Sequence, residues 1–281
     1  MNQARLPTIR PVTHAAAVIL AGGRSTRMGA DKALLPWHDS TLLSRTIGVL
    51  SRVVTGPVVV VVAPGQRLPG LPARVQLLAD PVPGQGPLAG LATGLTTLAR
   101  SGVPVAFACS TDLPFLHPAV VAAVLAALGP DVDAAVPTVA GIAQPLVAGY
   151  RTSLGQLASR LVSEGERRAT ALLTACRVRS LTGADLLADP AVAATDPELR
   201  SLLNVNHPDE YRLALARPGP VVQVLGPAGT GARRIQAHTL GGFAAAAGVD
   251  LVAGSRLLLN GVPIAADPDL VLVAGDRLCW S

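Results

Sequence analysis

The sequence has 281 residues and is short of cysteine, aromatic residues and lysine. Cys109, Cys176 and Cys279 are widely spaced and form no C-x-x-C pair, so neither a disulfide framework nor a zinc site is indicated. No G-x-S-x-G elbow occurs, and the histidines show no metal-ligand spacing, which leaves them as surface or capping residues. A chain of this kind fits a reducing compartment, and we predict a cytoplasmic protein.

Further absences exclude classes of partner. The apolar run at residues 57–63 has the length of a strand, and no run reaches membrane-spanning length. The formal net charge is +5, but the arginines are scattered and only two Trp, two Tyr and three Phe are available for base stacking. We therefore expect no membrane and no nucleic acid, and an anionic small molecule accounts for the charge. Residues 1–14 carry no signal-peptide core and are predicted to be a flexible tail.

The most informative segment that is present is LAGGRSTRMGADK, residues 20–32, which follows an apolar run at residues 15–20. That run has the length and branching of a strand buried on both faces. The pair Gly22-Gly23 would let backbone amides approach a polyphosphate, with Arg27 and Lys32 as cations. The spacing matches neither the dinucleotide fingerprint nor Walker A, so no dehydrogenase or P-loop ATPase is predicted. The alternative is a tight turn with a solvated basic loop.

Lys32 is the only lysine among 23 lysine and arginine residues. Because arginine serves as the cation everywhere else, we expect Lys32 where a compact ammonium is needed rather than a planar fork. The alternative is chance, since the last lysine of an arginine-rich chain must stand somewhere.

Strand-like runs alternate with helical ones, which predicts an α/β domain with a largely parallel sheet. The clearest helix covers residues 117–128, with Pro118 in its first turn and Gly129 near its end. Ligands collect at the carboxyl ends of strands in such sheets. The further strands are expected at residues 58–63, 75–79, 104–109, 134–137 and 146–150.

Polar residues follow these strands. Asp80 leads into PVPGQGPLAG, and a helix beginning near Leu88 would aim its amino end at an anion. The alternative for this loop is a proline-rich connector. Asp112 follows a buried strand, where a carboxylate must face solvent, a cation or a helix end, and magnesium is the expected partner. A helix N-cap is the alternative for Asp112.

The string LLNVNHPDEY adds Asn204 and Asn206 near the end of this region. Their amide oxygens could join the site of Asp112 or bind ribose. An Asx turn before a helix that starts near Pro208 explains them equally well.

Taken together, these strings resemble the molybdenum-cofactor guanylyltransferases, within the wider nucleotidyltransferase superfamily. The resemblance covers residues 15–215 and rests on LAGGRSTRMGADKALL, DPVPGQGPLAGL, STDLPFL, QPLVAGYR and LLNVNHPDEY, in that order. It implies a Rossmann-like, mostly parallel sheet over a domain at residues 15–216. It departs from the family where an asparagine often follows the second strand, because Val62, Ala63 and Pro64 stand there.

The resemblance also implies roles for individual residues. Lys32 and Arg27 would hold phosphates, and Asp112 would bind Mg²⁺ and act with them in catalysis. The nucleotide would contact Leu20, Ala21, Gly22, Gly23, Lys32, Asp80, Gly86, Pro87 and Asp112, and the second substrate would contact Gln144, Asn204 and Asn206.

The implied reaction transfers GMP from GTP to the terminal phosphate of molybdopterin and releases pyrophosphate. A charged phosphate oxygen is the nucleophile, so no general base is needed. A CTP-dependent cytidylyltransferase would share nearly every feature, but that group tends to have Ala-Ala-Gly where this chain has Ala21-Gly22-Gly23. Another small-molecule nucleotidyltransferase and an inactive nucleotide-binding scaffold are the remaining alternatives.

Residues 219–281 have a pattern of their own. Two strands, a short alanine-rich helix and two more strands, with a turn at Asn260-Gly261, look like a β-grasp module similar to the sulfur-carrier proteins. Carriers end in Gly-Gly, whereas this sequence ends Cys279-Trp280-Ser281, so sulfur transfer is not expected. We predict a docking or stabilising appendage, with a molybdoenzyme or a cofactor-biosynthesis protein as its partner.

Overall fold

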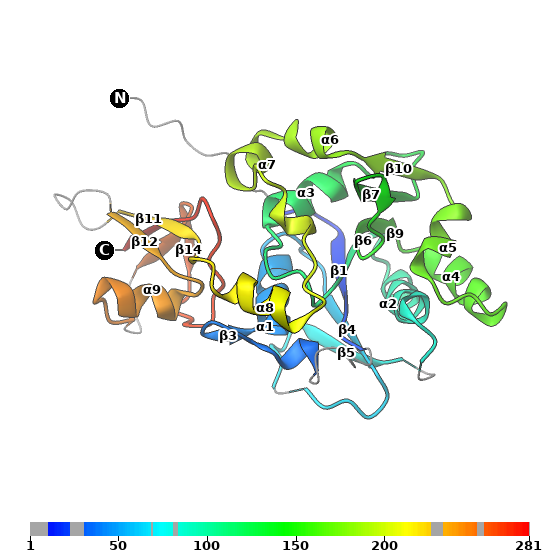
Figure 1. Ribbon diagram of the computed structural model, residues 1–281, viewed down its shortest axis with the longest axis horizontal. Helices are drawn as coiled ribbons and strands as arrows, with labels where there is room; N and C mark the ends of the chain where they lie inside the picture. Colours follow the sequence, from blue (N-terminus) through cyan, green and yellow to red (C-terminus); the bar gives the residue numbers. More distant parts are fainter. Residues whose placement is uncertain are drawn as a thin grey trace.

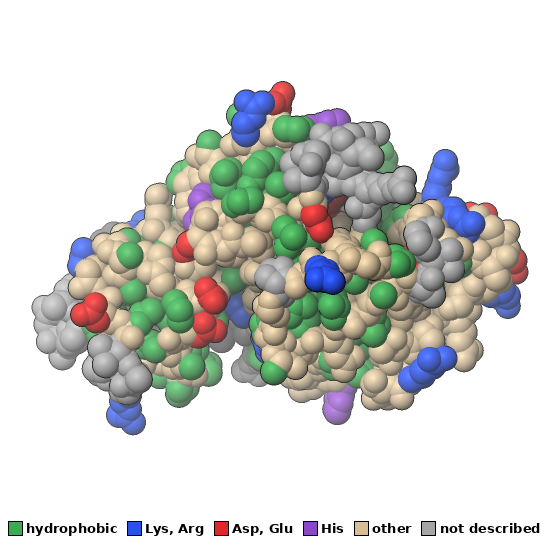
Figure 2. All heavy atoms as spheres, turned by 90° about the horizontal axis from the view of Figure 1, so that it is seen from below, with side chains coloured by type: hydrophobic (Ala, Val, Ile, Leu, Met, Phe, Trp, Pro, Cys, Tyr) green, Lys and Arg blue, Asp and Glu red, His purple; other side chains and the backbone are tan. Residues whose placement is uncertain are grey.

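The computed structural model describes residues 11–22, 31–68, 70–80, 84–225, 233–251 and 256–280. In these residues the chain forms a large sheet between two layers of helices, and its C-terminal part forms a smaller sheet to one side (Figure 1). Viewed from below, the C-terminal part is a lobe at the left of a larger body, and Lys and Arg side chains stand singly on this face (Figure 2). No helix in these ranges is long and apolar enough to cross a membrane.

The strands of the large sheet are β1 (Ala15–Leu20), β4 (Val58–Val62), β5 (Val75–Ala79), β6 (Val105–Ser110), β7 (Ala134–Val139), β8 (Ile142–Ala143), β9 (Val147–Arg151) and β10 (Val178–Leu181). Their order is β10-β7-β9-β6-β1-β4-β5, and β8 also pairs with β7. β1 lies parallel to β4 and β6, and β5 lies parallel to β4. β9 runs antiparallel to both of its neighbours, β6 and β7. The sheet is therefore mostly parallel, as the sequence predicts.

The helices of this part are α1 (Leu42–Ser51), α2 (Pro87–Arg100), α3 (Pro118–Ala126), α4 (Leu154–Ser163), α5 (Ala169–Thr174), α6 (Gly183–Leu187), α7 (Pro190–Thr195) and α8 (Pro208–Leu215). Shorter elements are the 3-10 turns η1 (Lys32–Leu34) and η2 (Arg200–Leu202) and the hairpin of β2 (Pro36–Trp37) and β3 (Ser40–Thr41).

Both faces of β1 are covered by helices. Its odd-numbered residues belong to a core with α1 and α3, and its even-numbered residues belong to a second core with α2 and α4. Successive side chains of a strand point to opposite faces, so a strand at the centre of a three-layer fold must be apolar throughout. All six residues of β1 are buried accordingly.

The sequence predicts this part well. Each predicted strand is present with bounds that differ by no more than two residues, and the predicted helix at residues 117–128 is α3, capped by His117. The pattern did not predict β10, which has three exposed residues of four, nor the two-residue strands β2 and β3. Such elements carry too few apolar positions for a periodicity to be visible.

The C-terminal sheet contains β11 (Val221–Leu225), β12 (Arg233–Gln236), β13 (Leu257–Leu259), β14 (Val262–Ile264) and β15 (Arg277–Trp280), and α9 (Leu240–Ala247) shares a core with it. Its strand order is β12-β11-β15-β13-β14, with the central pair β11 and β15 parallel. The pattern predicted four strands, and the described residues of this part form five because the turn at Asn260-Gly261 joins two separate strands. The apolar residues 270–273, expected within the last strand, precede β15 and contribute only an isolated bridge at Val271.

Candidate functional site

The predicted site residues lie at one edge of the large sheet, where its parallel strands end. Leu20, the last residue of β1, is in register with Ser110, the last residue of β6. On the other side of β1, Leu20 is in register with Val61 near the end of β4. The loop that contains Asp112 therefore starts beside the loop that follows β1, as expected for the carboxyl ends of parallel strands.

Lys32, Asp112 and Asn206 come together at this edge from three distant parts of the chain. Lys32 Nζ donates a hydrogen bond to Asn206 Oδ1 at 2.9 Å and lies 3.6 Å from Asp112 Oδ2. The Lys32 and Asp112 side chains are 19% and 16% exposed, so the ion pair is mostly withdrawn from water but open on one side. An ammonium group has three N–H donors, so at least one remains for a ligand.

Asp112 is fixed by its neighbours in the chain. Ser110 Oγ donates a short hydrogen bond to Asp112 Oδ1, and the backbone N–H of Val205 donates to Asp112 O at 2.9 Å. The second bond ties the strand-end loop to the segment that carries Asn206. Helix α3 is capped by His117 rather than by Asp112, so the N-cap alternative for Asp112 does not hold.

Asn206 is fixed at the amino end of α8. The carboxylate of Glu210 accepts from the backbone N–H of Asn206 at 2.7 Å and from that of His207 at 3.1 Å. These bonds, the one to Asn206 first, hold the pKa of Glu210 below its ordinary value. The Asn206 side chain is thus turned to Lys32, whereas Asn204, two residues earlier, is exposed.

Gln66 joins the two ends of the glycine-rich segment, and sequence reasoning missed it. Its Nε2 donates to Ala21 O at 3.1 Å and to Asp31 Oδ2 at 2.5 Å, and its Oε1 accepts from Ala63 N–H at 3.0 Å. Asp31 Oδ1 in turn accepts from Ala33 N–H at 3.0 Å and caps η1, the turn that carries Lys32. The only signal in the sequence was an amide side chain just after β4, where the family's asparagine was sought.

Gly22 is required by a close approach of two chain segments. A Cβ there would lie 2.7 Å from Ala63 N, and backbone atoms cannot yield. Leu20 and Ala21 are 8% and 7% exposed, so a ligand at this point would meet the backbone rather than their side chains. Gly23, predicted to contact the nucleotide, and Arg27, predicted to hold phosphates in catalysis, lie outside the described residues.

The second predicted nucleotide loop ends at the amino terminus of α2. Gly86 is the N-cap, with φ of +76°, and a Cβ there would lie 2.6 Å from Arg167 O. Pro87 is the first helical residue, and Leu88 N–H donates to the same carbonyl at 3.2 Å. Asp80 lies beside β4, since its N–H donates to Val62 O at 2.8 Å. These residues share the sheet edge with Lys32 and Asp112.

Gln144 lies near this edge on the antiparallel side of the sheet. It precedes β9, whose residue Val147 is in register with Cys109 of β6. Its backbone N–H donates to Pro137 O at 2.8 Å, and its side chain donates to Ile142 O at 3.1 Å. The side chain is partly exposed and available to a second substrate.

The donor set suits a magnesium ion that takes most of its ligands from phosphates. No group of three or more His, Cys, Asp or Glu side chains placed to hold a metal occurs in the ranges given above. Mg²⁺ in nucleotide sites is usually held by one or two carboxylates, with phosphate oxygens and water completing its octahedron. The Asp112 carboxylate lies 3.6 Å from Lys32 Nζ, and Asn206 Oδ1 lies 2.9 Å from the same nitrogen. These two oxygen-bearing side chains fit such a site.

Comparison with known proteins agrees with the fold and the motifs. Residues 17–180 match the family described as MobA-like NTP transferase domain. A protein of Mycobacterium tuberculosis (strain ATCC 25618 / H37Rv) named "Probable molybdenum cofactor guanylyltransferase" is 40% identical over 173 residues, which are 60% of this chain and 84% of that protein. A protein of the same name from Mycobacterium avium (strain 104) is 36% identical over 206 residues, 72% of this chain and 96% of that protein.

Solved structures show the same fold. The crystal structure of molybdopterin-guanine dinucleotide biosynthesis protein A from Archaeoglobus fulgidus superposes with a TM-score of 0.57 at 22% identity, covering 71% of this chain and 96% of that one. The fold and the sheet edge with its lysine and aspartate define a nucleotidyltransferase-type domain. The chain belongs to the MobA-like NTP transferase family. More than a quarter of it lies outside each of these alignments.

Proposed function

We propose that this protein transfers GMP from GTP to the terminal phosphate of molybdopterin and releases pyrophosphate. Its family membership and the names of relatives at 36–40% identity support the proposal. The observation that carries it is the meeting of Lys32 Nζ with Asn206 Oδ1 and the Asp112 carboxylate at the end of the parallel strands. A compact cation then lies beside a carboxylate that would bind a metal, and this pair suits phosphate transfer.

The reaction brings anions together. A terminal phosphate oxygen of molybdopterin would attack the α-phosphorus of GTP, a new P–O bond would form, and the bond from the α-phosphorus to the bridging oxygen would break. The attacking oxygen is already charged, so no proton has to be removed. What the site must supply is positive charge and alignment.

The residues divide this work. The Lys32 ammonium, aligned by Asn206 and Asp112, would offer its remaining N–H to a phosphate oxygen. The positive end of the α2 dipole would face the nucleotide's anionic part, whereas the N–H groups of Gly22 and Leu88 already donate to Val61 O and Arg167 O. Asp112, with Asn206, would hold Mg²⁺, which neutralises charge on phosphate oxygens when bound. Gln144, on the β9 side, would face molybdopterin.

The C-terminal sheet is proposed to be a β-grasp module, because its strands β11 and β15 are parallel and α9 packs on it. We propose that it contacts a molybdoenzyme or another protein of cofactor biosynthesis. The widely spaced cysteines support a reducing, cytoplasmic location.

The proposed function is tested by pyrophosphate release from the purified protein with molybdopterin, Mg²⁺ and each of GTP, CTP and ATP. Release with GTP, together with the guanine dinucleotide as product, is the expected result. Preference for CTP would show a cytidylyltransferase. Binding of nucleotide without release from any of the three would show an inactive scaffold.

A further inference from the structure

The C-terminal part packs against the catalytic domain and contributes side chains to its core. Val271 and Val273, in the loop before β15, are 3% and 2% exposed and belong to the core shared by β1, α1 and α3. Gly48 of α1 makes room for this loop, because a Cβ there would lie 2.4 Å from Val271 Cγ2. The sequence predicted an appendage with a core of its own. The C-terminal part has such a core, but its residues Val271 and Val273 also belong to the core of the catalytic domain.

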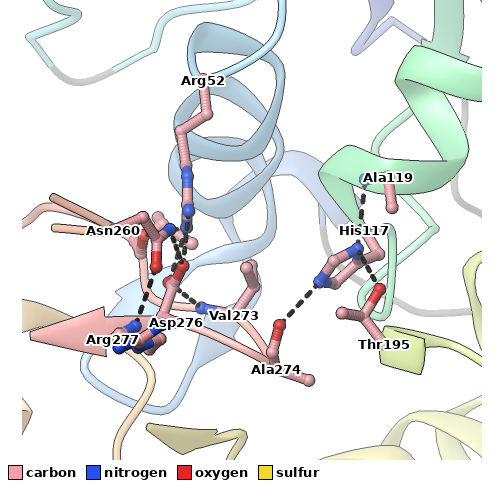
Figure 3. Close-up of polar contacts among 10 residues, drawn as sticks. Arg52, His117, Ala119, Thr195, Asn260, Val273, Ala274, Asp276 and Arg277 are labelled. Atoms are coloured by element: carbon pink, nitrogen blue, oxygen red, sulfur yellow. Dashed lines mark hydrogen bonds and ion pairs between the residues drawn. The ribbon is translucent and has the colours of Figure 1, made fainter. Parts of the chain in front are cut away.

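An ion pair fixes the same loop to the end of α1 (Figure 3). The Arg52 guanidinium donates to both oxygens of Asp276, at 2.7 and 2.6 Å, and Asp276 is 1% exposed. Asp276 also accepts from Asn260 Nδ2 at 2.9 Å and from Val273 N–H at 2.8 Å. A buried carboxylate with four donors has one defined position, so α1 and the loop are held in a fixed relation.

The segment that follows Lys32 contacts the C-terminal part at a second place, the β2–β3 hairpin. η1 continues into the β2–β3 hairpin and then into α1. At the hairpin, Asp39 Oδ2 accepts a short hydrogen bond from Thr239 Oγ1, the N-cap of α9. The His38 ring stacks on His238, with centroids 3.5 Å apart and planes inclined by 12°. The C-terminal part therefore contacts the Lys32 segment at both the hairpin and α1.

The segment that follows Asp112 reaches the same loop. It leads to His117, the N-cap of α3, whose Nδ1 accepts from Ala119 N–H at 3.1 Å. Nδ1 is thus unprotonated, and Nε2–H donates to Ala274 O at 3.0 Å (Figure 3). Arg45 of α1 adds a link, since its Nε donates a short hydrogen bond to Pro114 O within the Asp112 segment.

We propose that the C-terminal part is a positioning element for catalysis, which holds the segments behind Lys32 and Asp112 so that the two side chains meet at their working distance. The expected change in kcat rests on the proposed function, whereas the expected change in hydrogen exchange does not. Two segments that carry reacting groups and share one anchor move apart when the anchor loosens. A displacement of about 1 Å is enough to cost about a hundredfold in rate.

The test loosens the contact from the catalytic side and leaves the C-terminal sheet intact. Gly48→Ala places a methyl against Val271, although alanine favours the helix itself. Asp39→Ala removes the acceptor of Thr239. Val271→Ala in the Gly48→Ala chain removes the Cγ atoms that the new methyl meets. Arg233→Ala, at an exposed position of the edge strand β12, is the matched control.

Two readouts are taken on the full chain, amide hydrogen exchange and the separate kcat and KM for GTP. We expect Gly48→Ala and Asp39→Ala to speed exchange in residues 31–41 and 112–119 by about tenfold or more. We expect kcat to fall by about tenfold or more, with KM within about threefold, and Val271→Ala to restore part of the loss. Arg233→Ala should leave both readouts at their wild-type values.

Exchange at residues 31–41 and 112–119 that stays at the wild-type rate in both variants overturns the inference, whether or not the C-terminal sheet itself loses protection. An unchanged kcat in both variants also overturns the inference, provided that the wild-type chain is active. A wild-type chain that releases no pyrophosphate refutes the proposed function instead, and the exchange measurement still tests the positioning role.

Discussion

Gln66 Nε2 donates to Asp31 Oδ2 at 2.5 Å and so closes the glycine-rich segment at its base. The same nitrogen donates to Ala21 O, at the other end of that segment. One amide group thus sets the separation of the strand end from η1, the turn that carries Lys32. Ala21 and Asp31 are therefore held together by one side chain of the protein itself, which reduces the entropy lost when a nucleotide binds.

Replacing Gln66 should weaken GTP binding more than it changes the chemical step. Gln66→Ala removes all three side-chain hydrogen bonds of Gln66, and Gln66→Glu places a carboxylate against that of Asp31. We expect KM for GTP to rise by about tenfold for alanine and further for glutamate, because the separation of Ala21 from Asp31 must then be fixed when the nucleotide binds. Gln76→Ala, on an exposed position of β5, is the control and should match wild type. Equal KM values in all four proteins would contradict the role.

Part of the site could be predicted because it follows directly from strands. Asp112 and Asp80 follow apolar runs directly, and Lys32 ends the segment that follows a third, so their proximity follows from the carboxyl ends of these runs meeting in a parallel sheet. Gln66 could not be predicted, since its partners are 35 and 45 residues away and its own segment has no periodicity. Contacts of that range depend on loop conformation, which a pattern of apolar residues does not encode.

The C-terminal part shows the same limit at a larger scale. The alternating residues of Val221–Leu225 predicted a strand, and that strand is present as β11. Asp276 carried no pattern, and the apolar run at Val271 predicted a strand rather than a contact with α1. The partners of these two residues, Arg52 and Gly48, stand more than two hundred residues earlier. The elements could be predicted, and the interface between the two parts could not.

Asp112→Asn should lower turnover while the fold is kept. The asparagine is nearly isosteric and can still accept from Ser110, but it removes the charge opposite Lys32 and the proposed ligand for Mg²⁺. We expect kcat/KM to fall by a factor of about 10² or more, on the order of 3 kcal/mol. Asp131→Asn, at an exposed carboxylate, is the control. Near wild-type transfer by Asp112→Asn in Mg²⁺ would refute the role.

Lys32→Arg tests whether the one lysine is required as lysine. Arginine keeps the charge, but its planar fork cannot replace an ammonium that lies 2.9 Å from Asn206 Oδ1 and 3.6 Å from Asp112 in a partly closed site. We expect kcat to fall by a factor of about 10². The reverse exchange, Arg179→Lys on β10, should be silent. Full activity of Lys32→Arg would mean that lysine stands there by chance.

The stability of the chain should decrease as the pH falls below the ordinary histidine value of 6.5. Burial lowers the pKa of His117, and burial together with His38 lowers that of His238 to about 4. Between the lowered pKa values of the folded chain and 6.5, the unfolded chain binds protons that the folded chain does not. The free energy of unfolding therefore rises with pH in this range, and the stabilisation from the two histidines is fully present above pH 6.5.

Urea unfolding near neutral pH and at about pH 5 measures this slope. His238→Gln is expected to reduce the slope, and His14→Gln, at an exposed histidine, should leave it unchanged. The charged groups around His238 are Asp39 and Arg45, and those around His117 are Asp196, Asp276 and Arg52. A wild-type slope in His238→Gln would show that its proton is not taken up on unfolding.

Removing residues 219–281 should destabilise the catalytic domain. The cut exposes the surfaces that Val271 and Val273 cover and leaves Arg52 without its carboxylate. Two buried valines contribute about 3–5 kcal/mol, a large share of the stability of a domain. For a domain of this size we expect the midpoint of thermal unfolding to fall by about 10 °C or more.

Val271→Ala with Val273→Ala in the full chain should reproduce part of the fall, because it removes the same contacts without a cut. A truncated chain that unfolds at the wild-type temperature and turns over GTP at the wild-type rate would show that the C-terminal part is an independent appendage, and that the shared core contributes little.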